Sequence, residues 1–292
     1  MTDPVIPDTS PDKHADQLNK QRFSMLEDIA SELSGEVIFP ICFDSAIQIG
    51  TVMRSPNASL RQIADVVRTD PLVATKLLRL ANTVAYNPAG QNVTDVEKAI
   101  ARLGMATTRS TALACAMEQL VRSGRLVVFE EISNSMWQHS LKTAAAASVF
   151  ARKLTRISPD TAMLAGLIHD LGAFYMLDRA GNYPELVARP KSVVYLIAQW
   201  HESIGNMLMD ALGLPEEVVE AVREHDQPCA PIHELRTLKD IVYVANLFAG
   251  GLEEVEHLDL GEVPERPELS NPAFVALESD IEALYHELSR AL

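Results

Sequence analysis

The stretch GLIHDLG, residues 166–172, sets a constraint that the whole fold must satisfy. It places two titratable side chains, His169 and Asp170, next to each other inside an otherwise apolar run with helical character. Burying such groups without polar partners is costly. Adjacent residues on a helix point about 100° apart, so both side chains can reach one point only near a helix end. Gly172 supplies such an end, and partners from other segments are expected to meet the pair there.

Helical signals lie on both sides of this stretch. Ser59 and Gln62 form a capping box before LRQIADVV, in which apolar residues recur at i, i+3, i+4 and i+7. Asp70 and Pro71 begin the helical run PLVATKLLRLAN, with proline in the first turn, where its missing N–H costs nothing. Few segments alternate with a period of two. The sequence therefore predicts an almost all-α protein.

A third helix is predicted directly after these two. Thr94 and Glu97 form a capping-box pattern ahead of a periodic apolar run. Gly104 then fits the position at which a helix ends.

The composition is that of an ordinary globular chain. The 292 residues are 47% hydrophobic and 22% charged, which suits one large domain or two modest ones. The formal net charge of −15 argues against nonspecific nucleic-acid binding and against adsorption to anionic membranes. No secretory signal or membrane-length apolar stretch is present, and three widely spaced cysteines fit a reducing compartment. We expect a cytoplasmic protein.

The charge pattern suggests how the chain is organised. Residues 1–20 are rich in Pro, Asp and Lys and are expected to form a disordered tail. Residues 21–250 are expected to form one helical domain, with a first half at 21–125 and a second at 126–250 that holds most of the histidines. Residues 251–292 are expected to form an acidic extension, either a solvated face or a partner surface.

The extension ends in a predicted amphipathic helix. Five apolar residues recur at helical spacing: Phe274, Leu277, Ile281, Leu284 and Leu288. This stripe predicts that the helix packs back on the domain. A homodimer seam or a partner surface is the alternative.

Four of the eight histidines lie in separate predicted helices, near helix ends or in apolar stretches: His139, His169, His201 and His225. Asp170 and Asp226 adjoin two of them. Side chains from facing helices build the metal sites of helical bundles, and imidazole with carboxylate suits Zn, Mn or Fe. The alternative is a set of separate core or capping histidines, because no spacing here is as specific as HExxH.

GLIHDLG resembles the HD signature of the HD phosphohydrolase superfamily, and the wider pattern resembles its HDOD branch, the HD-related output domain. Five segments match in the family's order over roughly residues 30–250: TDPLVATKLLRLANTVAYN, TDVEKAIARLGM, MWQHSLKTA, AGLIHDLG and WHESIGNMLMDALGLPEEVVEAVREHDQP. The resemblance implies an all-α fold in which an HD-like helical domain packs on an N-terminal helical sub-bundle.

The resemblance also implies metal ligands. A first ion would be bound by His139, His169 and Asp170, together with a final aspartate. A second ion would share Asp170 with His201 and His225. We therefore expect one or two divalent ions, Fe, Mn or Zn.

The chain departs from the family's pattern at two of the expected ligands. Asn246 stands where the final aspartate is expected, and an amide is a neutral, weak ligand. His225-Asp226 stands in place of a doubled histidine, so Asp226 would either coordinate an ion or orient His225 from outside. The Gly-Tyr-Pro loop of relatives that cleave cyclic diguanylate is absent from QPCAPIHELRT, so that reaction is not expected.

The implied function is a bacterial signal-transduction role, in which the domain acts as an output or adaptor module for signalling proteins. One alternative is a metal-dependent phosphohydrolase for a nucleotide or phosphoester, with Asp170 orienting the attacking water. Another is a nucleotide sensor without turnover. If Asn246→Asp raised hydrolysis, the site would be a hydrolase scaffold lacking one ligand. Trp137 and Trp200, close to candidate ligands, are predicted to pack in the core, with base stacking as the alternative.

Overall fold

The computed structural model of the chain describes residues 11–34, 41–123, 126–227, 229–250 and 266–292. Within these ranges the regular elements are all helices, with no strand, so the predicted all-α class is confirmed. None of the helices in these ranges combines the length and apolar character needed to cross a bilayer.

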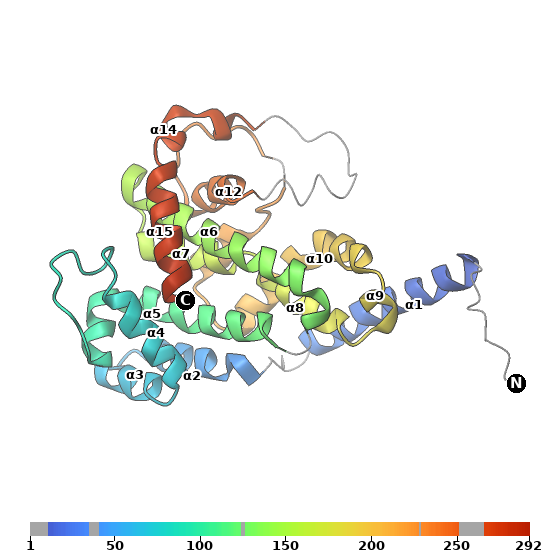
Figure 1. Cartoon of the computed structure of the whole chain (residues 1–292), viewed down its shortest axis with the longest axis horizontal. Helices are drawn as coiled ribbons and strands as arrows, with labels where there is room; N and C mark the ends of the chain where they lie inside the picture. Colours follow the sequence, from blue (N-terminus) through green and yellow to red (C-terminus); the bar gives the residue numbers. More distant parts are fainter. Residues whose placement is uncertain (1–10, 35–40, 124–125, 228, 251–265) are drawn as a thin grey trace, which may run out of the picture.

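The helices follow one another in this order (Figure 1): α1 (Pro11–Leu33), η1 (Ile41–Phe43), α2 (Asp44–Arg54), α3 (Leu60–Val67), α4 (Pro71–Ala81), α5 (Val96–Val121), η2 (Val127–Phe129), α6 (Glu130–Leu154), α7 (Pro159–Ile168), α8 (Leu171–Ala180), α9 (Pro184–Val187), α10 (Pro190–Ala211), α11 (Glu216–Val222), α12 (Leu238–Phe248), η3 (Pro267–Ser270), α14 (Pro272–Val275) and α15 (Glu278–Ala291).

Local signals start the helices of the N-terminal half much as predicted. Ser59 caps α3 in a capping box with Gln62, and the Asp70 carboxylate accepts hydrogen bonds from the first amides of α4. The start of α5 differs by one residue, because the extended Asp95, rather than Thr94, accepts the amide hydrogen bond of the first turn. Gly104 ends the first helical stretch of α5, as predicted, because its φ of +80° and ψ of 173° are not helical. A second helical stretch follows the kink and runs to Val121.

The second half is held together by close helix contacts at the two glycines of GLIHDLG. A Cβ at Gly166 would lie 2.8 Å from the carbonyl oxygen of Thr143 in α6. A Cβ at Gly172 would overlap the carbonyl oxygen of His201 in α10 and lie 2.5 Å from the amide nitrogen of Gly205. The backbones of α7 and α6, and of α8 and α10, therefore approach as only glycine allows. The residues between these two glycines are thereby fixed among α6, α8 and α10.

The first helix corrects two expectations about the N-terminus. Residues 11–20, expected to belong to a disordered tail, are helical, while residues 1–10 lie outside the described ranges. Apolar residues of α1 such as Met25 and Ile29 are buried, which stabilises a helix that composition alone disfavours. α1 also packs mainly on α8, α9 and α10 of the second half, and the Tyr175 hydroxyl donates a 2.5 Å hydrogen bond to Glu32.

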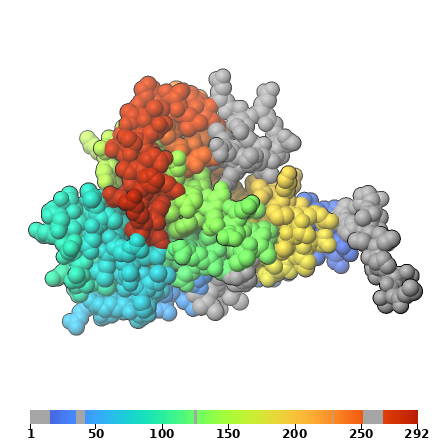
Figure 2. Space-filling view, in the orientation of Figure 1, coloured from blue at the N-terminus to red at the C-terminus, as the bar shows by residue number. Residues whose placement is uncertain are grey.

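The C-terminal segment packs back on the domain, as the apolar stripe predicts. α15 lies along α6 and also contacts α4, so it spans the junction between the two halves (Figure 2). Phe274 is 1% exposed and packs against Phe150 and Phe248, with ring centroids 5.6 and 6.5 Å away. Two surface ion pairs, Lys142–Glu282 and Lys153–Asp280, flank the contact at 3.0 Å each. Residues 251–265 of the acidic extension lie outside the described ranges.

We predict that Phe274→Ala lowers the free energy of unfolding by about 3–5 kcal/mol, because it leaves a cavity beside Phe150. Urea denaturation of the full chain measures this loss. The matched control is Val275→Ala in the same helix; Val275 is 37% exposed, and its truncation should change stability by less than about 0.5 kcal/mol. Equal effects of the two variants would mean that the aromatic contact does not hold the segment.

Candidate metal centre

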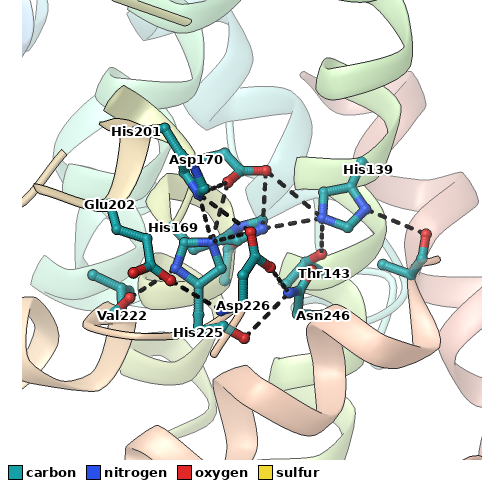
Figure 3. Close-up of polar contacts among 12 residues, drawn as sticks. His139, Thr143, His169, Asp170, His201, Glu202, Val222, His225, Asp226 and Asn246 are labelled. Carbon is teal, nitrogen blue, oxygen red and sulfur yellow. Dashed lines mark hydrogen bonds and ion pairs between the residues drawn. The ribbon is translucent and has the colours of Figure 1, made fainter. Parts of the chain in front are cut away.

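The structure brings all seven predicted ligand residues to one place in the second half (Figure 3). α6 supplies His139, the junction of α7 and α8 supplies His169 and Asp170, α10 supplies His201, the turn after α11 supplies His225 and Asp226, and α12 supplies Asn246. Six of the seven are buried, with exposed fractions of 1–9%, and only the Asp226 side chain, at 26%, is partly open. Chain segments more than 100 residues apart thus form a single polar cluster in the core.

Asp170 lies at the centre of this cluster. Its Oδ2 lies 3.7 Å from Nε2 of His139 and 3.2 Å from Nε2 of His169; we call these two residues the first histidine pair. Its Oδ1 lies 3.5 Å from Nε2 of His201 and 3.2 Å from Nε2 of His225, the second histidine pair. One carboxylate therefore faces two pairs of imidazoles, one with each oxygen.

Backbone carbonyls orient all four rings. The Nδ1 atoms bind carbonyl oxygens in four pairs: His139 with Ala249 at 3.3 Å, His169 with Gly166 at 2.8 Å, His201 with Ile197 at 2.8 Å and His225 with Val222 at 2.8 Å. A ring that donates its Nδ1–H in this way presents Nε2 to the centre, which is the arrangement that metal-binding histidines adopt.

The spacing of the donor atoms fits shared metal ions. The Nε2 atoms lie 3.0 Å apart in the first histidine pair and 3.3 Å apart in the second. Two neutral imidazoles whose Nε2 lone pairs face each other at this range repel unless a proton or a cation lies between them. Ligand atoms about 2.0–2.2 Å from one ion lie about 3.0–3.6 Å from each other. The donor set of imidazole and carboxylate therefore fits a Zn, Mn or Fe centre.

Comparisons with known proteins place the fold in a family. The family model described as HDOD domain matches residues 39–228. This chain belongs to the HDOD family. A structure of a candidate metal-dependent phosphohydrolase from Shewanella amazonensis SB2B is 25% identical, covers 91% of this chain and 99% of its own, and superposes with a TM-score of 0.67.

Two further relatives are more distant. An HDOD domain protein of unknown function from Geobacter sulfurreducens is 18% identical, with a TM-score of 0.58 over 94% of this chain and 99% of its own. An uncharacterized protein of Treponema pallidum (strain Nichols) is 24% identical over 219 residues, which are 69% of this chain. The HDOD chain described here spans 40% of the length of that curated relative.

The two departures of this HDOD chain from the family's pattern touch each other. The Asn246 amide group donates a 2.8 Å hydrogen bond from Nδ2 to Oδ1 of Asp226. Oδ2 of Asp226 lies 3.3 Å from Nε2 of His201 and 3.7 Å from Nε2 of His225. Asn246 therefore presents a donor, not an acceptor, toward Asp226, and Asp226 presents a carboxylate oxygen to the second histidine pair.

Glu202 is a site residue that sequence reasoning missed. It lies within 4.8 Å of the second histidine pair and Asp226 and could join a metal-binding group. Its carboxylate accepts hydrogen bonds from the Asp226 amide at 3.1 Å and from Gln227 Nε2 at 3.4 Å. Its position directly after His201 was the available signal, but only the fold shows that it holds the turn carrying Asp226.

The two tryptophans behave differently. Trp137 is buried, as predicted, whereas Trp200 is 46% exposed, so its predicted core packing is wrong. His201 points into the centre, and the side chain one position earlier on α10 is rotated by about 100° toward the surface.

Burial and the opposed charges set the ionisation of the cluster. Burial raises the pKa of Asp170, but the neighbouring His169 and His225 outweigh this and hold that pKa well below its usual range. Burial lowers the pKa of His169, and the adjacent Asp170 carboxylate offsets only part of this effect. Burial also lowers the pKa of His225, but the carboxylates of Asp226 and Asp170 outweigh it and raise this pKa to about 10. A metal ion at Nε2 of His225 would therefore compete with a tightly held proton.

We predict that Gly172→Ala destabilises the protein by about 1–3 kcal/mol, because the new Cβ forces α8 away from α10 and His201 away from Asp170. Urea denaturation reports the change. Gly50→Ala in α2 is the control, since the nearest atom to its Cβ would be Arg54 Nη1 at 3.8 Å. There we expect no loss and a gain of up to about 1 kcal/mol. Tolerance of Gly172→Ala would contradict the close approach of the two helices.

We predict that the chelator-treated protein loses stability as pH rises from 7 to above 10. The folded-state pKa of His225, about 10, exceeds its ordinary value of 6.5, so its contribution is complete below 6.5 and disappears as pH rises through 10. The measurement is the free energy of unfolding against pH. Asp226→Asn removes the leading favourable charge and should flatten the fall, and an equal slope in both proteins would refute the assignment.

Proposed function

We propose that this HDOD protein is a metal-dependent phosphohydrolase for a small phosphoester. The observation that carries the proposal is the Asp170 carboxylate, which faces two imidazole pairs whose Nε2 atoms converge and whose Nδ1 atoms are fixed by the backbone. The 25% identity to the candidate metal-dependent phosphohydrolase of Shewanella amazonensis adds support.

The residues divide into two binding groups. The first histidine pair with Oδ2 of Asp170 would bind one ion, and the second histidine pair with Oδ1 of Asp170 and Asp226 would bind another. A divalent ion there supplies a Lewis acid for the phosphoryl oxygens and makes water nucleophilic near neutral pH. Because both oxygens of Asp170 face imidazoles, its proposed main role is to fix the two groups relative to each other. Its role in orienting water remains a prediction.

Burial limits the substrate. The histidine and Asp170 donors are nearly closed to solvent, and the partly open Asp226 marks the side from which the centre can be reached. A terminal phosphoryl group fits such access better than a phosphodiester within a polymer. The net charge of −15 also gives the protein no general attraction for polyanions.

The second candidate is the signalling role, exercised in the cytoplasm through partner proteins or a bound nucleotide. It is favoured by the exposed apolar side chains of Trp200 and Met207, seven residues apart on α10 and thus on one face of it. His201, on another face of the same helix, enters the centre. Binding of a metal ion or nucleotide at the centre would then shift α10 and change the position of the exposed Trp200 and Met207 side chains.

The deciding experiment measures metal content and hydrolysis together. We expect about one or more equivalents of Fe, Mn or Zn by mass spectrometry in full-length protein purified without chelator or a nickel column. The double variant His169→Ala, Asp170→Ala should lose the metal. Hydrolysis of p-nitrophenyl phosphate should stop on chelation and return with one of these ions.

The matched control is Asp210→Asn, which removes an exposed carboxylate from α10 without touching the centre. Metal-free wild type with the same helical circular dichroism signal as the control would refute the metal centre. Bound metal with no hydrolysis of mono- or diester substrates would refute the hydrolase and favour the signalling role.

A further inference from the structure

The two halves of the centre are not equally supplied with negative charge. The first histidine pair meets one carboxylate oxygen, Oδ2 of Asp170. The second histidine pair meets two, Oδ1 of Asp170 and Oδ2 of Asp226. In the second group, each imidazole nitrogen lies 3.2–3.7 Å from each of these oxygens, and the two nitrogens lie 3.3 Å apart. These distances match the edges of a tetrahedral site with ligands at about 2.0–2.2 Å.

Asp226 is held in this position from two sides. Asn246 Nδ2 donates to Oδ1 at 2.8 Å, which leaves Oδ2 to face the histidines. The backbone amide of Asp226 donates to Glu202 at 3.1 Å, and Glu202 also accepts from Gln227. The reverse orientation of the Asn246 amide would set its oxygen against a carboxylate oxygen, so the donor end must face Asp226.

The backbone of the turn supports the same conclusion. Glu224 has a φ of +61°, a left-handed conformation that non-glycine residues rarely adopt and that surrounding contacts must offset. Its carboxylate pairs with Lys239 at 2.9 Å, and Nδ1 of His225 is bound to Val222 at 2.8 Å. The contacts of Glu224, His225 and Asp226 fix this strained turn, so that the side chains of His225 and Asp226 both lie at the centre.

We propose that the tightest divalent-ion site of this chain is formed by Asp170, His201, His225 and Asp226, and that Asn246 is a positioning residue for Asp226. The inference rests on the proposed metal centre and specifies which half of it binds the first ion. Asp226 supplies the second group with a carboxylate where the family's pattern has a histidine, and the neutral amide of Asn246 holds that carboxylate in place.

This assignment reverses the expected effect of restoring an acid at position 246. Asn246→Asp would set two carboxylates against each other where a 2.8 Å hydrogen bond now exists. Their repulsion would turn Asp226 away from the second histidine pair. The first ion should then bind more weakly, and the variant should not act as a repaired hydrolase.

The test is a Zn²⁺ titration of the chelator-treated full-length chain in competition with a chromophoric chelator, which resolves the first and second dissociation constants. Asp226→Asn and Asn246→Asp should each raise the Kd of the first ion by about tenfold or more. His139→Ala should weaken the second ion and change the first Kd by less than about threefold. Asp210→Asn should change neither constant. Circular dichroism verifies folding, and Asn246→Asp carries the test if Asp226→Asn unfolds.

The possible results separate the inference from the function on which it rests. Wild type that binds no Zn²⁺ refutes both. Wild type that binds Zn²⁺ while Asp226→Asn and Asn246→Asp leave the first Kd unchanged overturns the inference alone. A first Kd raised only by His139→Ala assigns the tight site to the first histidine pair. If Asn246→Asp bound the first ion more tightly, position 246 would be a missing ligand position and not a residue that positions Asp226.

Discussion

A single buried carboxylate that faces four imidazoles is the constraint on which the second half of this protein depends. Asp170 can be ionised in the core because its neighbour His169 and, from the turn after α11, His225 outweigh the effect of burial. His139 and His201 face the same carboxylate from α6 and α10. α6, α10 and the turn after α11 must therefore arrive at one point with fixed ring orientations, and carbonyl groups at their Nδ1 atoms provide that orientation. The glycines on either side of His169 and Asp170 serve the same end, because they let α7 and α8 approach their neighbours at backbone distance.

The same constraint bears on how HDOD chains can differ from one another. A chain can keep the four imidazoles and the central carboxylate while exchanging the residues around them. In this chain the two residues that differ from the family's pattern, Asp226 and Asn246, are hydrogen-bonded to each other. The effect of either residue therefore depends on the identity of the other. A ligand pattern compared position by position would count a lost acid and a lost histidine, whereas the structure shows a carboxylate in the histidine's place that is bound by the amide in the acid's place.

Much of the fold was predictable from the sequence because its signals are local. Capping residues and apolar periodicity predicted α3, α4 and the C-terminal helix. The spacing of the four histidines left open whether they share a centre, and the resemblance to the HDOD family implied that they do. The misses required tertiary information. Residues 11–20 look disordered by composition but belong to a helix that packs on α8–α10, and Trp200 is apolar but faces outward because its neighbour must face inward. The position of Glu202 directly after His201 did not disclose its role, since that role depends on the hydrogen bonds that its carboxylate accepts from Asp226 and Gln227.

The C-terminal helix has a consequence for how such a protein could move. The two halves are joined by the continuous packing of α5 against α7 and also by α15, which lies on α6 and receives a hydrogen bond from Arg79 of α4 at its Arg290 carbonyl. Among the described residues, packing on two sides restrains the two halves against opening about their junction. If the protein signals as proposed, this packing favours small sliding displacements of packed helices over opening of the two halves.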